Sequence, residues 1–413
     1  MKKRHFALQY EEIHDIHNYA VSVASCKNRL AKLEQGELGI RFIEKLKLAG
    51  LSDGRIAFYG DRVITLLKLF EKMNVKVADA QKKDCESVLA EILSQNYKGE
   101  SKRAFALVLL RLVHFAKTGE IGDRDSGYVD EVSWIRPSRY EDKGESIRAE
   151  DLLTVEDVSA LIDKTTNKRD RAMFWVMFEG AFRPGELLHL KVGGVEFRDN
   201  YLLLSTHGKT GNKRVALVVS FKPLLEWLAE HPLRDDPKAP LWYSFSSMSK
   251  TKSVTYGYLR EHLKRCKEKA GIKKRVWNYL FRHSQLTLLA KKLSDQTLCV
   301  YGNWKSGSDM PARYVHLSGK DAENAILQLH GIKNDSDQSS VATLKACPRC
   351  GEQNTPEIKR CLRCGFILDE KLLAEVSKQE QTEISSIVSR LERLESLGEK
   401  MDRIIESLLE KRN

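Results

Sequence analysis

Four separated side chains have the chemistry needed to act on a phosphodiester: Arg183, Lys209, Arg282 and Tyr314. Attack on phosphorus builds negative charge on the nonbridging oxygens, and two guanidinium groups held there would stabilise that charge. A phenol has a pKa of about 10, so Tyr314 becomes a nucleophile only where nearby cations stabilise its phenolate. Taken singly, each of the four residues is more commonly an ordinary surface or half-buried side chain.

The order and context of these residues favour a shared site. Arg183 lies in GAFRPGELLHL, Lys209 in HGKTGNK, Arg282 in LFRHS and Tyr314 in GSDMPARYVHLS. Together these segments resemble the tyrosine recombinases, the phage integrase family, and the last two are most similar to archaeal members. The motifs cover roughly residues 150–330. The N-terminal region is more loosely similar to the core-binding domain of the family.

The resemblance implies a mechanism and a role for each residue. Tyr314 would attack the DNA backbone to leave a 3′-phosphotyrosyl link and a free 5′-hydroxyl, whose oxygen Lys209 would protonate. The bond energy stays in the covalent link, so neither ATP nor a catalytic metal is expected. Glu186 lies one turn past the first arginine and would orient it or a neighbouring side chain. Trp304 would donate its indole N–H to phosphate and pack beside the nucleophile, or serve only as a core aromatic.

One position departs from the family pattern. The family commonly has a histidine three residues before the second arginine, and this chain has Tyr279 there. A tyrosine hydroxyl can donate to a phosphate oxygen but is a weak general base near neutral pH. Either Tyr279 substitutes in part for that histidine, or His283, next to Arg282, contributes, or catalysis is slow. Tyr279 and Tyr301 are also rival nucleophiles, but of the three tyrosines only Tyr314 lies in the motif.

Two close pairs of cysteines form a C-x2-C-x10-C-x2-C pattern: Cys347, Cys350, Cys361 and Cys364. Each pair is followed by a glycine, which permits the tight turn that brings both thiolates onto one ion. The pattern resembles a zinc ribbon and predicts a structural Zn²⁺ with no open coordination position. The alternative to a metal site is a set of disulfides or a redox pair. If it is a zinc ribbon, its surface would contact either DNA or another protein.

Composition favours a nucleic-acid partner. The chain of 413 residues has a formal net charge of +12 and a pI near 9.1, with many acidic residues as well. This balance is typical of a globular protein with one basic face. The sequence has no apolar run near the roughly 18 residues of a membrane span and no signal peptide. We therefore expect a cytoplasmic, nucleoid-associated protein that binds double-stranded DNA.

Hydrophobic periodicity predicts a mainly α-helical protein with a small β-sheet. A helix is expected to begin at Thr154, and YLLLST and RVALVV flank a glycine-rich connection typical of a β-hairpin. The expected segments are a helical core-binding domain (1–120), a linker (121–150), a mixed α/β catalytic domain (151–330), a second linker (331–345), the zinc ribbon (346–369) and a C-terminal helix (370–413).

The C-terminal helix carries apolar residues in alternating three- and four-residue steps if Gly398 takes one position. They are Ile384, Ile387, Leu391, Leu394, Met401, Ile405 and Leu408. This heptad pattern predicts either a self-associating coiled coil or a helix that packs on its own protein.

The family resemblance implies a homo-tetramer that exchanges strands on DNA. Integration of a mobile element, resolution of replicon dimers and excision all fit it. The alternatives are a catalytically impaired relative that acts as a DNA-binding accessory or regulator, and a topoisomerase.

Overall fold

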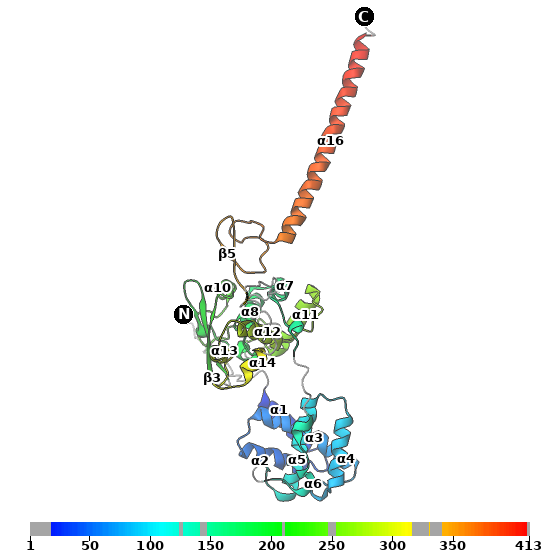
Figure 1. The fold of residues 1–413 in the computed structure, drawn as a ribbon, viewed down its shortest axis with the longest axis vertical. Coiled ribbons are helices and arrows are strands. Elements are labelled where there is room, and N and C mark those ends of the chain that lie inside the picture. Colours follow the sequence, from blue (N-terminus) through cyan, green and yellow to red (C-terminus); the bar gives the residue numbers. More distant parts are fainter. Residues whose placement is uncertain are drawn as a thin grey trace, which may run out of the picture. The chain divides into compact units, whose positions relative to one another are not determined.

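The computed structural model describes residues 18–123, 127–140, 147–208, 211–246, 253–315, 330 and 341–410. They form many helices and two small sheets, which confirms the predicted mainly helical fold class (Figure 1). The chain divides into two compact units, Met1–Asp151 and Leu152–Asn413. Among the described residues, no helix has both the length and the apolarity needed to cross a bilayer.

The first unit is a helical bundle in which α5 contacts four other helices. Phe42 packs against Tyr59 and Phe115, with ring centroids 6.3 and 5.5 Å apart, at the centre of an aliphatic core. The apolar faces of these amphipathic helices supply that core. The helices are α1 (Tyr19–Leu30), α2 (Gly36–Leu48), α3 (Asp53–Lys72), α4 (Lys82–Ser94), α5 (Gly99–Thr118) and α6 (Asp130–Ser133).

Part of the segment expected as the first linker packs on this bundle. Val132 and Ile135 are almost fully buried in the same core as α5, and the short α6 contacts α4 and α5. The glycines and charges of this segment suggested a solvated chain, but two well-placed apolar side chains are enough to attach it. The second expected linker lies largely outside the described residues.

The second unit is built around α8, whose residues 172–179 are all buried and which contacts α7, α10 and α12. Thr154 caps α7 as predicted, in a reciprocal capping box with Asp157. The helices are α7 (Val155–Asp163), α8 (Lys168–Glu179), α9 (Pro184–Leu188), α10 (Phe221–Glu230), α11 (Tyr256–Ala270), α12 (Asn278–Ala290), α13 (Asp295–Gly302) and α14 (Met310–Val315).

The predicted hairpin is present and belongs to a three-stranded antiparallel sheet. β2 (Leu202–Gly208) pairs with β3 (Gly211–Leu217), and β1 (Val195–Phe197) adds a third strand on the other side of β2. Sequence reasoning missed β1 because three residues are too few to show a period of two. Along β3, Lys213, Val215 and Leu217 are buried, whereas the residues between them are exposed.

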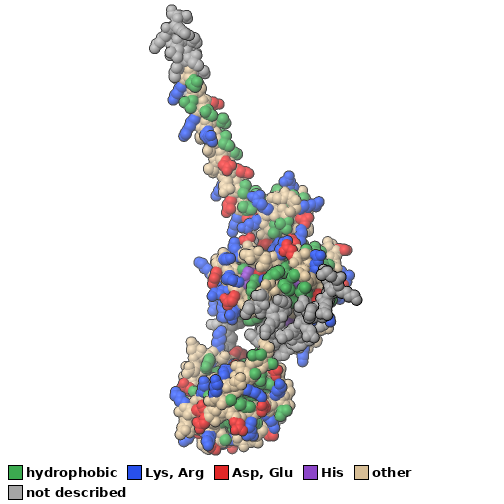
Figure 2. Space-filling view, turned by 180° about the vertical axis from the view of Figure 1, so that it is seen from behind, with side chains coloured by type: hydrophobic (Ala, Val, Ile, Leu, Met, Phe, Trp, Pro, Cys, Tyr) green, Lys and Arg blue, Asp and Glu red, His purple; other side chains and the backbone are tan. Residues whose placement is uncertain are grey.

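The cysteine-rich segment contains β4 (Lys345–Ala346) paired with β5 (Gln353–Asn354) and leads into α16 (Glu370–Glu410). Ion pairs attach it to the helices of the second unit. The Arg171 guanidinium of α8 lies 2.8 Å from a Glu357 oxygen, and Lys222 of α10 bonds to Glu352. Apolar side chains are exposed along α16, among them Leu391 and Leu394 at 55% and 64% (Figure 2).

Candidate active site

The turn between α8 and α9 presents the first arginine. Ala181 has a φ of +45°, a left-handed conformation that a residue with a Cβ rarely adopts. The chain then turns through Phe182 to Arg183, which is the N-cap of α9. Glu186 at the third position of α9 accepts from the Arg183 backbone N–H at 2.9 Å and from its Nη1 at 2.5 Å. A local cap therefore fixes both the backbone and the side chain of this arginine.

The second arginine comes from α12 and lies against the same turn. Arg282 is only 3% exposed, and its Nη1 donates to the Ala181 carbonyl at 2.7 Å. Its Nη2 donates to the Gly302 carbonyl at the end of α13. Arg183 reaches the same helix end, because its Nη2 donates to the Asn303 carbonyl at 3.4 Å. The two guanidinium groups thus lie near the ends of α8 and α13, and Arg282 reaches them from α12.

A single carboxylate lies between the two cations. A Glu186 oxygen is 3.9 Å from Arg282 Nη1, besides its bonds to Arg183. Burial alone would raise the pKa of Glu186, but Lys213, the Arg183 backbone N–H and the two guanidinium groups together lower it. Burial, and then the nearby Arg183, lower the pKa of Arg282 to about 10, so it stays charged at neutral pH. The cluster is therefore net positive and suits an anion.

Tyr314 of α14 directs its hydroxyl into this cluster. The Tyr314 Oη lies 3.1 Å from His283 Nδ1, and the Tyr314 ring stacks with the rings of His283 and Trp304 at centroid distances of 5.9 and 5.4 Å. Burial raises the pKa of Tyr314, although Arg282 and Arg183 partly oppose this. The tyrosine is therefore a neutral phenol near pH 7, in contact with an imidazole.

His283 is a suitable proton acceptor. Burial, assisted by Arg282, lowers the pKa of His283 below its usual 6.5, so its ring is neutral near pH 7. Tyr279 lies one turn earlier on α12, with its ring centroid 6.4 Å from that of His283. Tyr279 is 38% exposed, whereas Tyr314 is 3% exposed. Of the two residues considered for the proton-acceptor role, it is His283 that contacts the Tyr314 hydroxyl.

The other predicted residues are placed as follows. Trp304 contacts both Tyr314 and the Arg282 guanidinium, which is 5.3 Å from its ring centroid. The rival Tyr301 donates its hydroxyl to the Glu179 carbonyl, which turns it away from this cluster. Lys209, which follows β2 and precedes β3 in the sequence, lies outside the described residues.

Sequence reasoning missed Lys213. Its side chain is 2% exposed, and its Nζ donates to the carbonyls of Gly180 at 2.6 Å and Ala181 at 3.3 Å. Burial, and then Arg282, hold the pKa of Lys213 well below its ordinary value. The available signal was its position in β3, because every second residue of a strand faces the same way and Lys213 shares the inward face with Val215 and Leu217.

The family comparison agrees with this arrangement. The family model described as "Phage integrase family" matches residues 151–320, which include all residues of the cluster. Residues 151–320 are therefore similar to the phage integrase family. The chain is also similar to the tyrosine recombinase XerA of Thermococcus onnurineus (strain NA1), with 30% identity over 167 residues. That match covers 38% of this chain and 56% of the relative, so the chain spans little more than half of the relative's length.

Solved structures with a similar fold cover most of the chain. XerH site-specific recombinase bound to a palindromic difH substrate is similar with a TM-score of 0.52 and 18% identity, over 78% of this chain and 99% of that one. The Tn1549 transposon integrase (residues 82–397) in complex with circular intermediate DNA has a TM-score of 0.51 and 12% identity, over 70% and 98%. At these identities the likeness concerns the fold alone.

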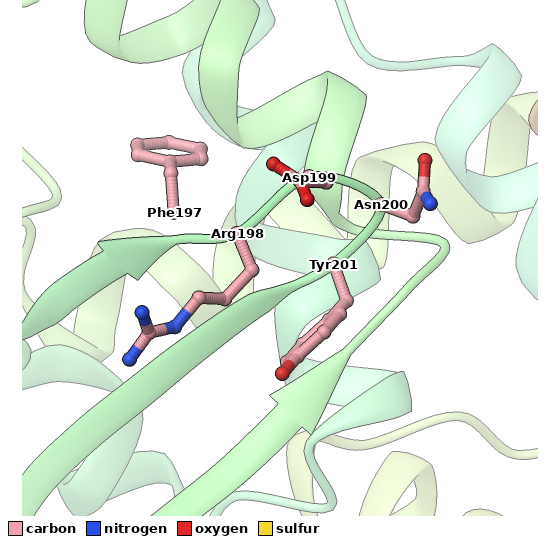
Figure 3. A pocket seen from close by; sticks show the side chains of 5 residues that line it. All are labelled: Phe197, Arg198, Asp199, Asn200 and Tyr201. Carbon is pink, nitrogen blue, oxygen red and sulfur yellow. The ribbon is translucent and has the colours of Figure 1, made fainter.

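A surface pocket of the second unit is lined by residues outside the cluster. The turn between β1 and β2, residues 197–201, lines it (Figure 3). Figure 3 shows Arg198 and Tyr201 extending to one side of the turn and Phe197 to the other. No predicted site residue lines this pocket, and we assign it no part in the chemistry.

The four paired cysteines form a second centre. Their sulfur atoms all lie within 4.8 Å of one another. The Sγ atoms are 3.5 Å apart for Cys347 and Cys364, and 3.6 Å apart for Cys350 and Cys361. Four sulfurs at about 2.3 Å from a tetrahedral ion would be about 3.8 Å apart. The observed spacing therefore fits one metal ion.

The two cysteine turns have the same backbone geometry. Gly351 and Gly365 have φ of 73° and 74°, and each donates its N–H to the carbonyl of the first cysteine of its pair. Only glycine adopts this conformation without strain, as the sequence pattern predicted. The fully buried Asn354 donates its Nδ2 to Cys361 Sγ at 3.6 Å, a contact that would support a thiolate ligand.

Proposed function

We propose that the protein is a site-specific DNA recombinase that cuts and rejoins duplex DNA through a 3′-phosphotyrosyl intermediate. The observation that carries this proposal is the contact between the Tyr314 hydroxyl and a neutral His283, beside two arginines that share Glu186. A buried phenol needs both a proton acceptor and a positive environment before it can attack an anion. This cluster supplies both.

The reaction then proceeds by displacement at phosphorus. Tyr314 Oη transfers its proton to His283 Nδ1 and bonds to phosphorus, while the bond from phosphorus to the 5′-oxygen breaks. Lys209 protonates the leaving 5′-oxygen, a role assigned from the family motif. Arg183 and Arg282 stabilise the charge on the nonbridging oxygens, since both are already held by backbone carbonyls or Glu186. The reverse reaction joins a new 5′-hydroxyl and releases the tyrosine.

The departure at Tyr279 is consistent with this scheme. His283 replaces the family histidine as proton acceptor, and Tyr279 supports His283 from the preceding turn of α12 or donates to phosphate. Trp304 helps to keep the Tyr314 ring in place by stacking on it. The nucleophile therefore contacts two aromatic rings before DNA binds.

Double-stranded DNA is the proposed partner. The net charge of +12 favours binding to phosphates and predicts a steep loss of affinity with salt. XerH and the Tn1549 integrase, which share the fold, were solved with DNA. Assembly as a homo-tetramer on DNA is part of the proposal, as is location at the nucleoid.

The proposed metal is a structural Zn²⁺ held by all four paired cysteines. Four thiolates suit zinc, fill its tetrahedral shell and leave no position for substrate, so its contribution is to the folding of the ribbon. Through Arg171 and Lys222 the folded ribbon attaches to α8 and α10. It thereby fixes the start of α16, whose exposed apolar stripe we propose to pair with a second copy.

A trapping experiment tests the function without knowledge of the target site. The protein is incubated with nicked duplexes of randomised sequence, in which cleavage releases a short fragment and leaves the protein attached. The wild type should form an adduct that survives denaturing electrophoresis and enriches one sequence. Tyr314→Phe should bind the enriched duplex equally well and form no adduct.

The experiment also separates the alternatives. Adduct formation by Tyr314→Phe would reject the assignment of the nucleophile. Sequence-selective binding by the wild type without any adduct would instead indicate an accessory or regulatory protein. Adducts without sequence preference, together with relaxation of supercoiled DNA, would indicate a topoisomerase.

A further inference from the structure

We propose that Lys213 is a positioning residue, which holds the turn at residues 180–182 and thereby places both arginines for strand cleavage. This inference rests on the proposed function and deepens it. Lys213 lies four residues past the hairpin lysine assigned as proton donor, and it serves a different purpose.

The position of the Lys213 amine supports this role. β3 directs the side chain inward, and the Nζ bonds to the Gly180 and Ala181 carbonyls at 2.6 and 3.3 Å. The same Nζ lies 4.4 Å from the ring centroid of Phe182. One amine thus contacts three successive residues of a single turn. A proton donor to DNA must direct its N–H groups at the substrate, whereas this amine is directed at two backbone carbonyls.

A shared acceptor connects the lysine to the second arginine. The Ala181 carbonyl accepts from Lys213 Nζ and also from Arg282 Nη1, at 2.7 Å. The direction of this carbonyl is therefore one of the contacts that set the position of the Arg282 guanidinium. Because Ala181 has a φ of +45°, the turn is intrinsically strained and relaxes unless its surroundings hold it.

The same turn also places the first arginine. Arg183 follows Ala181 by two residues and is the N-cap of α9, so a rotation of the turn moves its backbone and Glu186 together. Two cations that bind one phosphate must keep their relative position, and a displacement of about 1 Å is enough to lower a rate by about 100-fold. Lys213 acts on both arginines through one segment of backbone.

A purely stabilising role does not explain a lysine here. A buried amine is costly to desolvate, and an apolar residue of similar length avoids that cost but leaves the Gly180 carbonyl without this donor, so the two effects oppose each other. Lys213→Met should therefore fold, with a thermal transition close to that of the wild type, and should bind DNA with unchanged affinity. Its cleavage rate should nevertheless fall by about 100-fold, because the turn loses its donor.

The test measures single-turnover cleavage of the duplex enriched by the wild type, with Lys213→Met, Lys213→Arg and the matched control Ala216→Met. Ala216 is on the exposed face of the same strand, so its variant should cleave like the wild type. Lys213→Arg keeps a donor and should recover part of the rate. If Lys213→Met does not fold, Lys213→Gln takes its place with the same expected loss of cleavage.

A modified substrate separates positioning from proton donation. In a duplex with sulfur at the bridging 5′-position, the leaving thiolate needs no proton. This substrate should restore cleavage by Lys209→Met but leave Lys213→Met impaired. Restoration of Lys213→Met, or cleavage of ordinary DNA by Lys213→Met at the wild-type rate, would overturn the inference and leave the proposed function intact. Absence of any wild-type adduct would refute the proposed function itself, and with it the role of Lys213.

Discussion

Replacement of His283 by phenylalanine tests the proton transfer at the centre of the proposed mechanism. The change retains an aromatic ring that stacks on Tyr314 but removes the nitrogen 3.1 Å from its hydroxyl. Tyr279→Phe is the matched variant, because it also removes one polar group from the same face of α12 and keeps the ring. Comparison of the two variants shows whether His283 or Tyr279 accepts the proton.

The expected effect follows from the ionisation of Tyr314. A phenol with a pKa of about 10 is about 0.1% ionised at pH 7, and burial raises the pKa of Tyr314 further. Without an acceptor, cleavage must start from this small phenolate fraction. We therefore expect His283→Phe to cleave about 10³-fold more slowly at pH 7, within the range for loss of a general base.

The pH dependence of the cleavage rate is an independent test of the proton acceptor. Burial lowers the pKa of His283, so the neutral acceptor form predominates above that pKa and is lost as the pH falls through it. Wild-type cleavage should rise with pH through this lowered value and be flat above about pH 6.5. His283→Phe should instead gain about tenfold per pH unit up to about pH 9, because each unit raises the phenolate fraction tenfold.

The assay is single-turnover adduct formation on the enriched nicked duplex between pH 5.5 and 9, with thermal unfolding and DNA affinity measured for each variant. Tyr279→Phe should lose less than about tenfold and keep the wild-type pH profile. A His283→Phe protein that is folded, cleaves within about threefold of wild type and has a flat profile would refute the reasoning. A loss confined to Tyr279→Phe would assign the acceptor to Tyr279.

Three further outcomes are expected. Glu186→Gln should lower the free energy of unfolding by about 2–3 kcal/mol, measured by urea denaturation, because Arg183 and the buried Arg282 lose their shared carboxylate. An unchanged free energy of unfolding would show that the backbone carbonyls alone hold the two arginines. Elemental analysis should find one zinc per chain. Cys350→Ser should lower both the zinc content and the melting temperature without changing the cleavage rate of the folded protein. Full metal content in this variant would contradict the four-thiolate site. Leu391→Lys should weaken self-association in sedimentation experiments relative to Ser389→Lys on the same helix, and equal behaviour of the two variants would argue against pairing through α16.

Local sequence determined several features that need no distant partner. The Thr154 cap and its reciprocal Asp157 depend on residues three positions apart, and the glycines after the cysteine pairs sit in the conformation that only glycine tolerates. The hairpin followed from two alternating runs around glycines. The helical fold class followed from the 3.6-residue period. Each of these signals is complete within a few residues.

Packing decided what contacts Tyr314. On α12, Tyr279 and His283 are four residues apart and share one face, so periodicity does not say which of them meets a tyrosine 31 residues beyond His283. The choice depends on how α14 packs against α12. The same holds for Arg183 and Arg282, because their spacing along the chain says nothing of the Glu186 carboxylate between them or of the carbonyls that hold them.

The sequence by itself thus determined which reacting groups the chain carries and on which elements they lie, because residue type and local period are written in order along the chain. Only the tertiary structure decided that Lys213 is inside, that its amine shares the Ala181 carbonyl with Arg282, and that Val132 and Ile135 join a core. Burial and long-range hydrogen bonds depend on which surfaces meet, and that depends on all the elements at once.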